Sequence, residues 1–197
     1  MTFRGDFEHR DDLLRAAVTE FSDRGYGNAS LNRILDVAGM SKGQLYHHFA
    51  GKEGLYLALV EWMIDRKVEW FATHPPQRSD DCVAAIGTQI SASLEFAAAH
   101  PDVDRLARAL LAERGQPIFG KVVSRYGFNP DSALGDLVDH CYAQGRFRAD
   151  LSPDFVRRAV ITVINNMPDL LDLTGPADVG PRIEELLTFL RSGLMWP

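Results

Sequence analysis

Apolar residues recur every three or four positions along almost the whole chain, and this spacing restricts the possible folds more than any other feature of the sequence. In the first segment the residues at this spacing are Leu14, Ala17, Val18 and Phe21, which place one apolar stripe along a helix. Strand-like alternation between hairpin turns is essentially absent. The sequence therefore predicts an all-α protein of about nine helices, with three short helices at the front and longer ones behind.

Capping residues and helix breakers predict where the helices begin and end. Gly25 is expected to stop the first helix in a left-handed conformation. Ser30 is a natural N-cap for a helix over residues 31–38, which Gly39 closes. Later breaks are predicted near Phe49, His74 to Pro76, His100–Pro101, Gly115, Gly127 to Pro130, Ser152–Pro153 and Gly180–Pro181. In addition, Asn165–Asn166 interrupts an apolar segment just before Pro168.

A helix-turn-helix unit is predicted near the N-terminus. Its two short helices flank a tight turn at Gly39–Met40, and Ser41 with Gln44 matches a capping box at the start of the second helix. Leu45 and Phe49 are four residues apart, so both are expected to face the core. The second helix of such a unit can lie in the major groove of DNA, with its N-terminal residues near the base edges.

The outer surface of that second helix carries side chains that suit contact with DNA. Lys42 offers a cation for phosphate, and Gln44 has the donor and acceptor that can read adenine. Gly43 costs about 1 kcal/mol of helix stability relative to alanine, but it lets the backbone approach DNA closely. The remaining candidates are the possible phosphate donors Tyr46, His47 and His48, and residues near helix N-termini, where free N–H groups favour an anion: Ser30, Asn32, Arg33 and Lys52.

A solvated helix face is the plainer alternative for the histidine pair. Adjacent histidines do not share one face of a helix, so paired metal ligation is not expected, and no metal or cofactor is predicted.

The segment FSDRGYGNASLNRILDVAGMSKGQLYHHFAGKEGLYLALVE resembles the N-terminal signature of the TetR (tetracycline repressor) family. The motif AGMSKGQLYHHFAGKEGL matches the family pattern almost throughout, while Leu35 to Ala38 differ from the commoner residues and keep the apolar positions. The resemblance covers about residues 10–60. It implies a helix-turn-helix DNA-binding domain over residues 1–52 and a ligand-binding and dimerisation domain over residues 53–197.

Specific roles follow from this resemblance. The family motif assigns DNA contacts to Gln44, Tyr46, His47, His48 and Lys52, and the contacts of Ser30, Asn32, Arg33 and Lys42 follow from the same match. The implied partner is double-stranded operator DNA. Repression is the family default, and release by a small apolar or amphipathic effector is implied; activation is the alternative.

Dimerisation is expected through the last two long helices. Their apolar stripes are Val156, Val160, Val163, Ile164 and Met167, and then Ile183, Leu186, Leu187, Leu190 and Leu194. The resemblance favours a four-helix bundle between two subunits, with twofold symmetry. The alternative is that both stripes pack inside one subunit.

Aromatic residues and glycines in the middle of the chain predict an apolar effector cavity, with an ordinary core as the alternative. The candidate ligand-binding residues are Trp62, Arg66, Phe71, Gln89, Phe96, Phe119, Tyr126, His140 and Asn165. An effector packing against the long fourth helix is expected to tilt it and so change the spacing of the two DNA-binding heads.

The overall charge does not suit a protein that grips DNA over its whole surface. The formal net charge is −6, and residues 28–54 hold three basic and two acidic side chains with two histidines. Binding is therefore expected to depend on dimer avidity and helix termini, with a shallower salt dependence than that of a strongly basic protein.

Two cysteines, Cys82 and Cys141, belong to no CxxC pair, and two reduced thiols are expected, with a disulfide as the alternative. No signal peptide is visible, and no apolar run reaches the roughly 18 residues of a membrane span. The expected location is the cytoplasm, without a membrane partner.

No motif of a common enzyme class is found, so catalysis is not expected. The alternative function is an apolar-ligand-binding or protein-docking helical module whose head no longer binds DNA.

Overall fold

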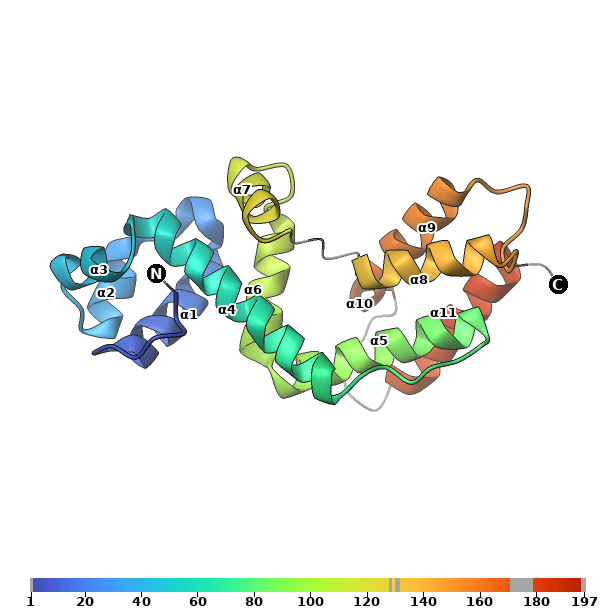
Figure 1. The fold of residues 1–197 in the computed structure, drawn as a ribbon, viewed down its shortest axis with the longest axis horizontal. Helices are drawn as coiled ribbons and strands as arrows, with labels where there is room; N and C mark the ends of the chain where they lie inside the picture. Colours follow the sequence, from blue (N-terminus) through green and yellow to red (C-terminus); the bar gives the residue numbers. More distant parts are fainter. Residues whose placement is uncertain (1, 128, 130–131, 171–178, 196–197) are drawn as a thin grey trace. The chain divides into compact units, whose positions relative to one another are not determined.

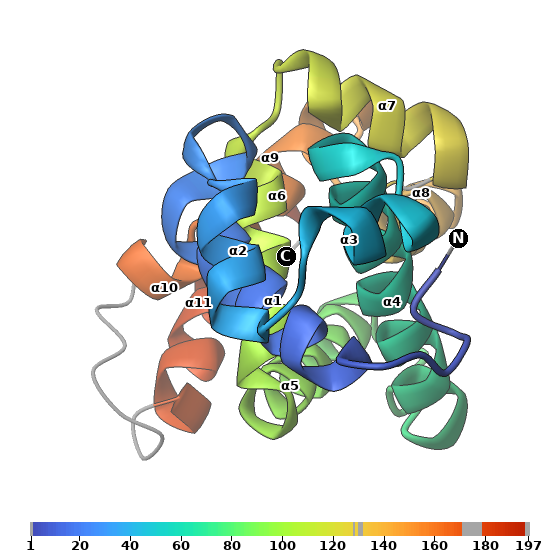
Figure 2. The ribbon, with the colours of Figure 1, turned by 90° about the vertical axis from the view of Figure 1, so that its left-hand side faces the viewer.

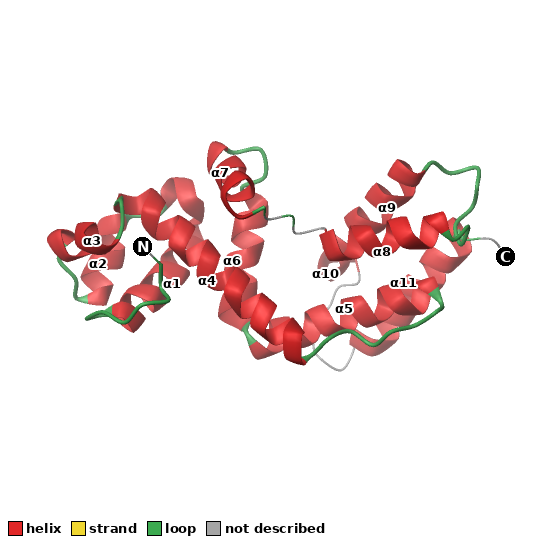
Figure 3. Ribbon diagram, viewed as in Figure 1, coloured by secondary structure: helices red, strands yellow, loops and turns green. Residues whose placement is uncertain are grey.

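A computed structural model describes residues 2–127, 129, 132–170 and 179–195, which form helices and no strand (Figures 1 and 3). The helices are α1 (Arg10–Asn28), α2 (Leu31–Ala38), α3 (Lys42–His48), α4 (Gly51–Thr73), α5 (Cys82–Ala99), α6 (Pro101–Ala112), α7 (Pro117–Tyr126), α8 (Ser132–Ala143), α9 (Pro153–Asn165), α10 (Met167–Leu170) and α11 (Val179–Leu194). The all-α prediction is confirmed. The estimate of about nine helices is low, mainly because the segment after Ser152 divides into α9 and α10 at Asn166.

The chain divides into two compact units. Unit 1 comprises residues 1–74 and 95–128, and unit 2 comprises residues 75–94 and 129–197. The predicted functional boundary between residues 52 and 53 falls in the first turn of α4. Because α4 is continuous there and α6 and α7 pack against it, the compact unit is larger than the predicted head. The assignment of separate functions to residues 1–52 and 53–197 stays a prediction.

Unit 1 has a single apolar core in which α1 packs against α2, α4 and α6. Leu45 and Phe49, predicted to face inward, are buried with relative exposures of 0% and 3%. Phe21 from α1 and Ile34 from α2 belong to the same core. The helix-turn-helix is therefore fixed to a longer scaffold by the apolar side of each short helix.

The first helix is interrupted at Gly25, as expected, although the element α1 includes one further turn. Gly25 has a positive φ of 68°, as predicted, but its ψ of 169° lies outside the left-handed helical region, and a short helical stretch continues to Asn28. The kink lets the Tyr26 N–H donate to Glu113 Oε1 at 2.7 Å, just after α6. The glycine therefore separates the main part of α1 from a last short turn that runs in a new direction.

Unit 2 contains a second core formed by α5, α8, α9 and α11. The apolar stripes of α9 and α11 are largely buried inside this unit; Val156 and Val160 have relative exposures of 0%. On α5, a Cβ at Gly87 would lie 2.7 Å from Leu187 Cδ1, so α5 and α11 cross closely there. The burial of Val156 and Val160 therefore agrees with the alternative that both stripes pack within one subunit.

The expectation of two free thiols is wrong. Cys82 and Cys141 form a disulfide between α5 and α8, with the Cα atoms 5.9 Å apart. Both residues lie in the core of unit 2, with exposures of 5% and 1%. Packing of the two helices brings the cysteines within bridging distance, although they are separated by 59 residues in the sequence.

Several predicted boundaries are confirmed. Ser152 caps α9 by accepting from the Phe155 N–H, with Pro153 at the first helical position, and Gly127 closes α7 with a φ of 59°. Pro130 lies outside the described residues, as do the side chains of Pro168 and Val179. Among the described helices one, α5, has the length and composition of a membrane span, and 44% of it is buried inside the structure.

Candidate nucleic-acid interface

The turn between α2 and α3 is held by local hydrogen bonds that the sequence predicts. Ser30 Oγ accepts from the Arg33 N–H at the start of α2, and Gly39 ends that helix with a φ of 66°. Ser41 Oγ accepts from the Gln44 N–H at 3.2 Å, while Gln44 Oε1 accepts from the Ser41 N–H at 2.8 Å. This completed capping box fixes the first turn of α3, from which a recognition helix would read DNA.

The outward side of α3 is open. Lys42, Gly43 and His47 are exposed, and Tyr46 keeps 62% of its surface. A Cβ at Gly43 would meet only Ser41 Oγ, at 3.9 Å. Figure 2 shows α3 and α2 side by side in unit 1. Lys42, Gly43, Tyr46 and His47 therefore form one accessible face of α3, with Leu45 on the opposite, buried side.

Gln44 is partly occupied by its structural role. Its carbonyl oxygen accepts the Ser41 N–H, and its amide nitrogen has no hydrogen-bond partner among the residues that the structure describes. Bidentate recognition of adenine requires both groups. Gln44 can therefore offer a donor to a base without disturbing α3, whereas full adenine recognition would open the capping box.

Lys52 is held by the end of α1. Its Nζ donates to the Gly27 carbonyl oxygen at 3.0 Å and lies 4.9 Å from the centroid of the Tyr26 ring. Burial lowers the pKa of the Lys52 ammonium, with partial opposition from the charges of Glu20 and Glu113. Two donor hydrogens remain on the ammonium, so contact with phosphate is compatible with this position.

Arg33 is paired with Glu20 on α1. The Arg33 Nε lies 3.0 Å from Glu20 Oε1, which also accepts the Ser30 N–H at 2.7 Å. The hydrogen bond to Arg33 is the main reason why the pKa of the Glu20 carboxyl is lowered and that of the Arg33 guanidinium is raised. Arg33 thus contributes little net charge towards DNA, whereas Asn32 beside it is exposed.

His48 is also engaged. Its ring stacks on Phe7 from the N-terminal segment, with the centroids 4.3 Å apart. The side chain is half-buried, unlike its neighbour His47. The predicted set of DNA contacts therefore divides into two groups. The open group comprises Asn32 on α2 with Lys42, Gly43, Tyr46 and His47 on α3. The group with protein partners comprises Ser30, Arg33, Gln44, His48 and Lys52.

The candidate effector residues divide between the two units. Unit 1 holds Trp62, Arg66, Phe71, Phe96, Phe119 and Tyr126, and unit 2 holds Gln89, His140 and Asn165. Phe71 stacks on Phe96 at 5.8 Å, and the Tyr126 hydroxyl donates to the Leu57 carbonyl at 2.8 Å. Trp62 and Arg66 line a hollow of about 260 Å³ beside the N-terminal segment. No single unit brings all nine residues together.

Sequence reasoning did not single out Lys67 and Trp70 as a polar pair. They lie one turn apart on α4, next to Phe96 and His100. The Trp70 Nε1 is buried and has no hydrogen-bond partner within the described part of the chain, and Lys67 Nζ lies 5.7 Å from the Phe96 centroid. Burial lowers the Lys67 pKa, with opposition from the Asp104 charge. The sequence gives no signal for this pair, because a lysine and a tryptophan one turn apart are also found on ordinary amphipathic helices.

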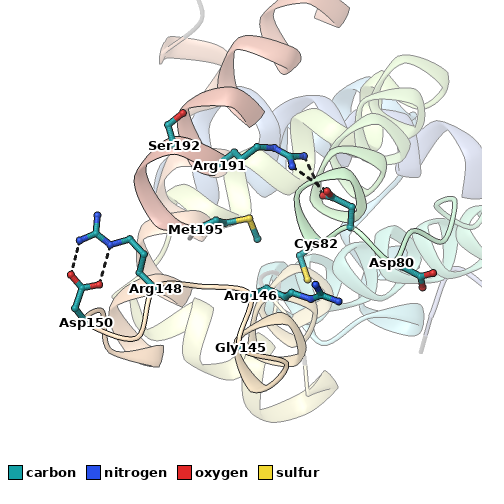
Figure 4. A pocket seen from close by; sticks show the side chains of 10 residues that line it. Asp80, Cys82, Gly145, Arg146, Arg148, Asp150, Arg191, Ser192 and Met195 are labelled. Atoms are coloured by element: carbon teal, nitrogen blue, oxygen red, sulfur yellow. Dashed lines mark hydrogen bonds and ion pairs between the residues drawn. The ribbon is translucent and has the colours of Figure 1, made fainter. Parts of the chain in front are cut away.

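A larger hollow, of about 1010 Å³, lies in unit 2 and contains none of the predicted effector residues (Figure 4). It is lined by Asp80, Asp81, Cys82, Gly145, Arg146, Arg148, Asp150, Arg191, Ser192 and Met195. Arg191 pairs with Asp81 and Arg148 pairs with Asp150. The lining is charged and internally compensated, so this hollow does not match the apolar cavity that the sequence predicts.

Comparison with known proteins places this arrangement in a family. The profile described as "Bacterial regulatory proteins, tetR family" matches residues 13–59. The HTH-type transcriptional repressor KstR2 of Mycolicibacterium smegmatis is 30% identical over 157 residues, covering 77% of this chain and 73% of the relative. The HTH-type transcriptional repressor AcnR of Corynebacterium diphtheriae is 27% identical over 182 residues, covering 90% of this chain and 88% of the relative.

Other matches are shorter or show the fold alone. The match covers 28% of the transcriptional activator FasR of M. smegmatis, at 48% identity, and 43% of the regulator RutR of Escherichia coli K12, at 35% identity. These two relatives are thus matched over less than half of their length. A TetR family regulator from Chloroflexus aurantiacus J-10-FL aligns with a TM-score of 0.77 and 23% identity, covering 99% of this chain and 97% of that chain. On the sequence relationship and the helix-turn-helix together, the chain belongs to the TetR family of bacterial transcriptional regulators.

Proposed function

We propose that this protein is a transcriptional repressor that binds operator DNA as a homodimer and leaves it when a small apolar or amphipathic effector binds. The open polar face of α3 carries the proposal. Lys42, Tyr46 and His47 are exposed on a helix whose first turn is fixed by a capping box. A rigid short helix with an unobstructed face fits the major groove.

Duplex binding tests this proposal. Fluorescence anisotropy with duplex DNA from upstream of the protein's own gene is expected to show binding at low salt. Tyr46→Ala and Lys52→Ala should weaken binding to all sequences, whereas Gln44→Ala should relax base preference. Val68→Ala, at a residue on α4 that is 64% exposed, is the control and should leave affinity unchanged. If none of the three α3 and α4 variants alters affinity, the assignment of the head is wrong.

The competing function is a ligand-binding or protein-docking module whose head is inactive towards DNA. The completed capping box and the exposed face of α3 favour DNA binding, because a docking module has no need of a polar face at that position. A protein that ignores every duplex in dilute buffer but still binds an apolar ligand would support the alternative.

The effector is proposed to bind unit 1 beside α4, and to carry an acceptor or anionic group on an apolar body. Trp70 Nε1 is a buried donor that no described residue accepts. The half-buried Lys67 ammonium lies over the Phe96 ring, and Phe71 stacks on Phe96 beside them. A buried donor without a partner costs about 1–3 kcal/mol, and an effector acceptor would remove that cost. The helix α4 begins at Gly51, where a Cβ would lie 3.5 Å from the Tyr46 ring. One helix therefore connects the proposed effector site to α3.

A matched pair of fluorescent probes tests the effector chemistry. 1-Anilinonaphthalene-8-sulfonate carries a sulfonate that N-phenyl-1-naphthylamine lacks. The sulfonate compound should bind about tenfold more tightly, since a hydrogen bond to a charged group contributes about 1.5–3 kcal/mol. Lys67→Met should abolish that preference, and Trp70→Phe should reduce it. Equal binding of the two probes to the wild-type protein, or an unchanged preference in Lys67→Met, would refute the proposed chemistry without affecting the assignment of the head.

The homodimer is proposed to form through the outward faces of α9 and α11. Most residues of the stripes first predicted for this contact are buried inside unit 2, so they are not available to a partner. On the outer faces, Phe189 of α11 is 63% exposed and Phe155 of α9 is 49% exposed. Large exposed aromatic side chains are common anchors of protein interfaces, and family membership supports a twofold pairing.

A further inference from the structure

Residues 2–9, here called the N-terminal arm, precede α1 and have an ordered position on unit 1. Phe3 is buried, with 2% relative exposure, and it belongs to the core of the unit. The first turn of α1 closes the arm, because Arg10 donates to the Phe3 carbonyl from Nε at 2.9 Å and from Nη2 at 2.5 Å. The arm is thus held at its start by the buried Phe3 ring and at its end by the hydrogen bonds from Arg10.

The arm packs against the C-terminal end of α3. The Phe3 and Phe49 ring centroids are 5.2 Å apart, and those of Phe7 and Phe49 are 5.9 Å apart in an edge-to-face arrangement. Phe7 also stacks on His48, at 4.3 Å. Because α3 has only seven residues, it cannot be stable alone and depends on tertiary contacts for its orientation.

The same arm is tied to α4. Arg4 donates to Asp65 through Nε at 2.9 Å and through Nη2 at 2.8 Å, and Glu61 Oε1 lies 3.5 Å from that Nη2. This two-point pairing holds the guanidinium plane against the middle of α4. Figure 2 shows the dark-blue segment passing α3 and α4 before it enters α1.

We infer that the N-terminal arm is a positioning element for operator binding, in which Phe7 and Arg4 fix α3 relative to α4 without touching DNA. This inference rests on the proposed function. Arg4 is unsuited to a phosphate contact, since Asp65 occupies its guanidinium fork and Glu61 adds a second negative charge beside it. Phe7 faces His48 and Phe49, so its ring is committed to the protein.

Removal of the Phe7 ring gives the first test. Phe7→Ala is expected to weaken operator affinity about fivefold, because the aromatic packing that orients α3 is lost. The slope of affinity against salt concentration should stay unchanged, since no phosphate contact is removed. Amide exchange of residues 42–48 should become faster. Phe7→Leu, which keeps apolar volume, should recover part of the affinity and guards against a simple folding defect.

A double-mutant cycle gives the second test. If Arg4 acts through Asp65, Arg4→Ala and Asp65→Ala should weaken binding by similar factors, and the double variant should be no worse than either. If Arg4 instead contacts phosphate, Arg4→Ala should reduce the salt slope by about 1, and Asp65→Ala should strengthen binding. Glu69→Ala on the same helix removes an equal charge without an arm contact and is the control.

The possible outcomes distinguish failure of the inference about the arm from failure of the proposed function in DNA binding. Failure of the wild-type protein to bind any duplex overturns the proposed function. Normal duplex binding together with unchanged affinity and unchanged α3 exchange in Phe7→Ala overturns the inference alone. A salt slope that falls in Arg4→Ala shows that the arm contacts DNA and refutes positioning by the pair with Asp65.

Discussion

Gly25 is a residue whose role depends on one backbone angle and one neighbour. Its φ of 68° is strained for any residue with a side chain, and a Cβ would lie 2.7 Å from Glu113 Oε1. Gly25→Ala is therefore expected to lower the free energy of unfolding by about 2–3 kcal/mol, from strain in a backbone region that essentially only glycine adopts and from the weakened Tyr26–Glu113 hydrogen bond. Urea unfolding measures the loss.

Gly27→Ala is the matched control for that substitution. Gly27 lies in the same helix, has no left-handed φ, and would place its Cβ in open space. Alanine there should leave stability unchanged or raise it slightly. Equal losses for the two variants would mean that neither the angle nor Glu113 matters.

Glu20 makes the stability of unit 1 depend on pH. The hydrogen bond from Arg33 and the N–H of Ser30 lower its carboxyl pKa below the usual 4.5. A depressed folded-state pKa contributes stability that is present above about 4.5 and is lost as the pH falls through the folded value. The difference in unfolding free energy between wild type and Glu20→Gln should therefore be largest near neutral pH and shrink below pH 4.5.

Arg33→Met provides the independent comparison, because it removes the main cause of the shift and leaves the carboxyl in place. In that background Glu20→Gln should have a much smaller effect at neutral pH. Denaturation curves recorded between pH 3 and pH 7 measure both effects. A wild-type advantage that persists unchanged at pH 3 would show that Glu20 does not act through its charge.

At the residue scale, helix caps can be predicted from neighbouring residues, whereas side-chain partners that are distant in the sequence cannot. Ser30, Gly39 and the Ser41–Gln44 box follow from neighbours within a few positions, and the structure confirms each one. The partner of Lys52 is 25 residues away. Such distant partners become visible only when helices pack, so side chains expected to face DNA freely are found bound to α1.

At the scale of elements, the disulfide ties α5 to α8 across a loop of 59 residues. Closing a loop of that length reduces the entropy of the unfolded chain, and the contribution is about 4 kcal/mol in the simplest treatment. Reduction with dithiothreitol is expected to lower the urea midpoint of unit 2 accordingly. Cys82→Ala should show the same loss and no further response to dithiothreitol. A midpoint insensitive to reduction would contradict the prediction.

Apolar stripes identify buried helix faces, but they do not identify what buries them. The stripes on α9 and α11 were correctly placed, and the expectation that they meet a second subunit is wrong for Val156, Val160, Leu186 and Leu190, which are buried within unit 2. A stripe has the same spacing in both cases. Close crossings such as that of Gly87 with Leu187 decide the partner, and they depend on the tertiary structure.

At the scale of the whole molecule, the lack of net positive charge on the head makes pairing of two heads important, because residues 1–52 hold seven basic and seven acidic side chains. The chain carries a net charge of −6, and Arg33 is compensated by Glu20. Few phosphate contacts remain for one head, so the affinity of a monomer for a half-site should be low. Two linked heads convert the second contact into an intramolecular one and can raise affinity by roughly 10²–10⁴-fold.

A charge placed on the outer face of α11 separates these contributions. Phe189→Glu is expected to produce a monomer in sedimentation equilibrium, because burial of a carboxylate in an apolar contact is unfavourable. Affinity for a two-half-site operator should fall on the order of 100-fold, while affinity for a single half-site stays unchanged. Val68→Glu adds the same charge at an exposed residue of unit 1 and should remain dimeric. A Phe189→Glu protein that is still dimeric would place the interface elsewhere, and a monomer with full operator affinity would show that one head is sufficient.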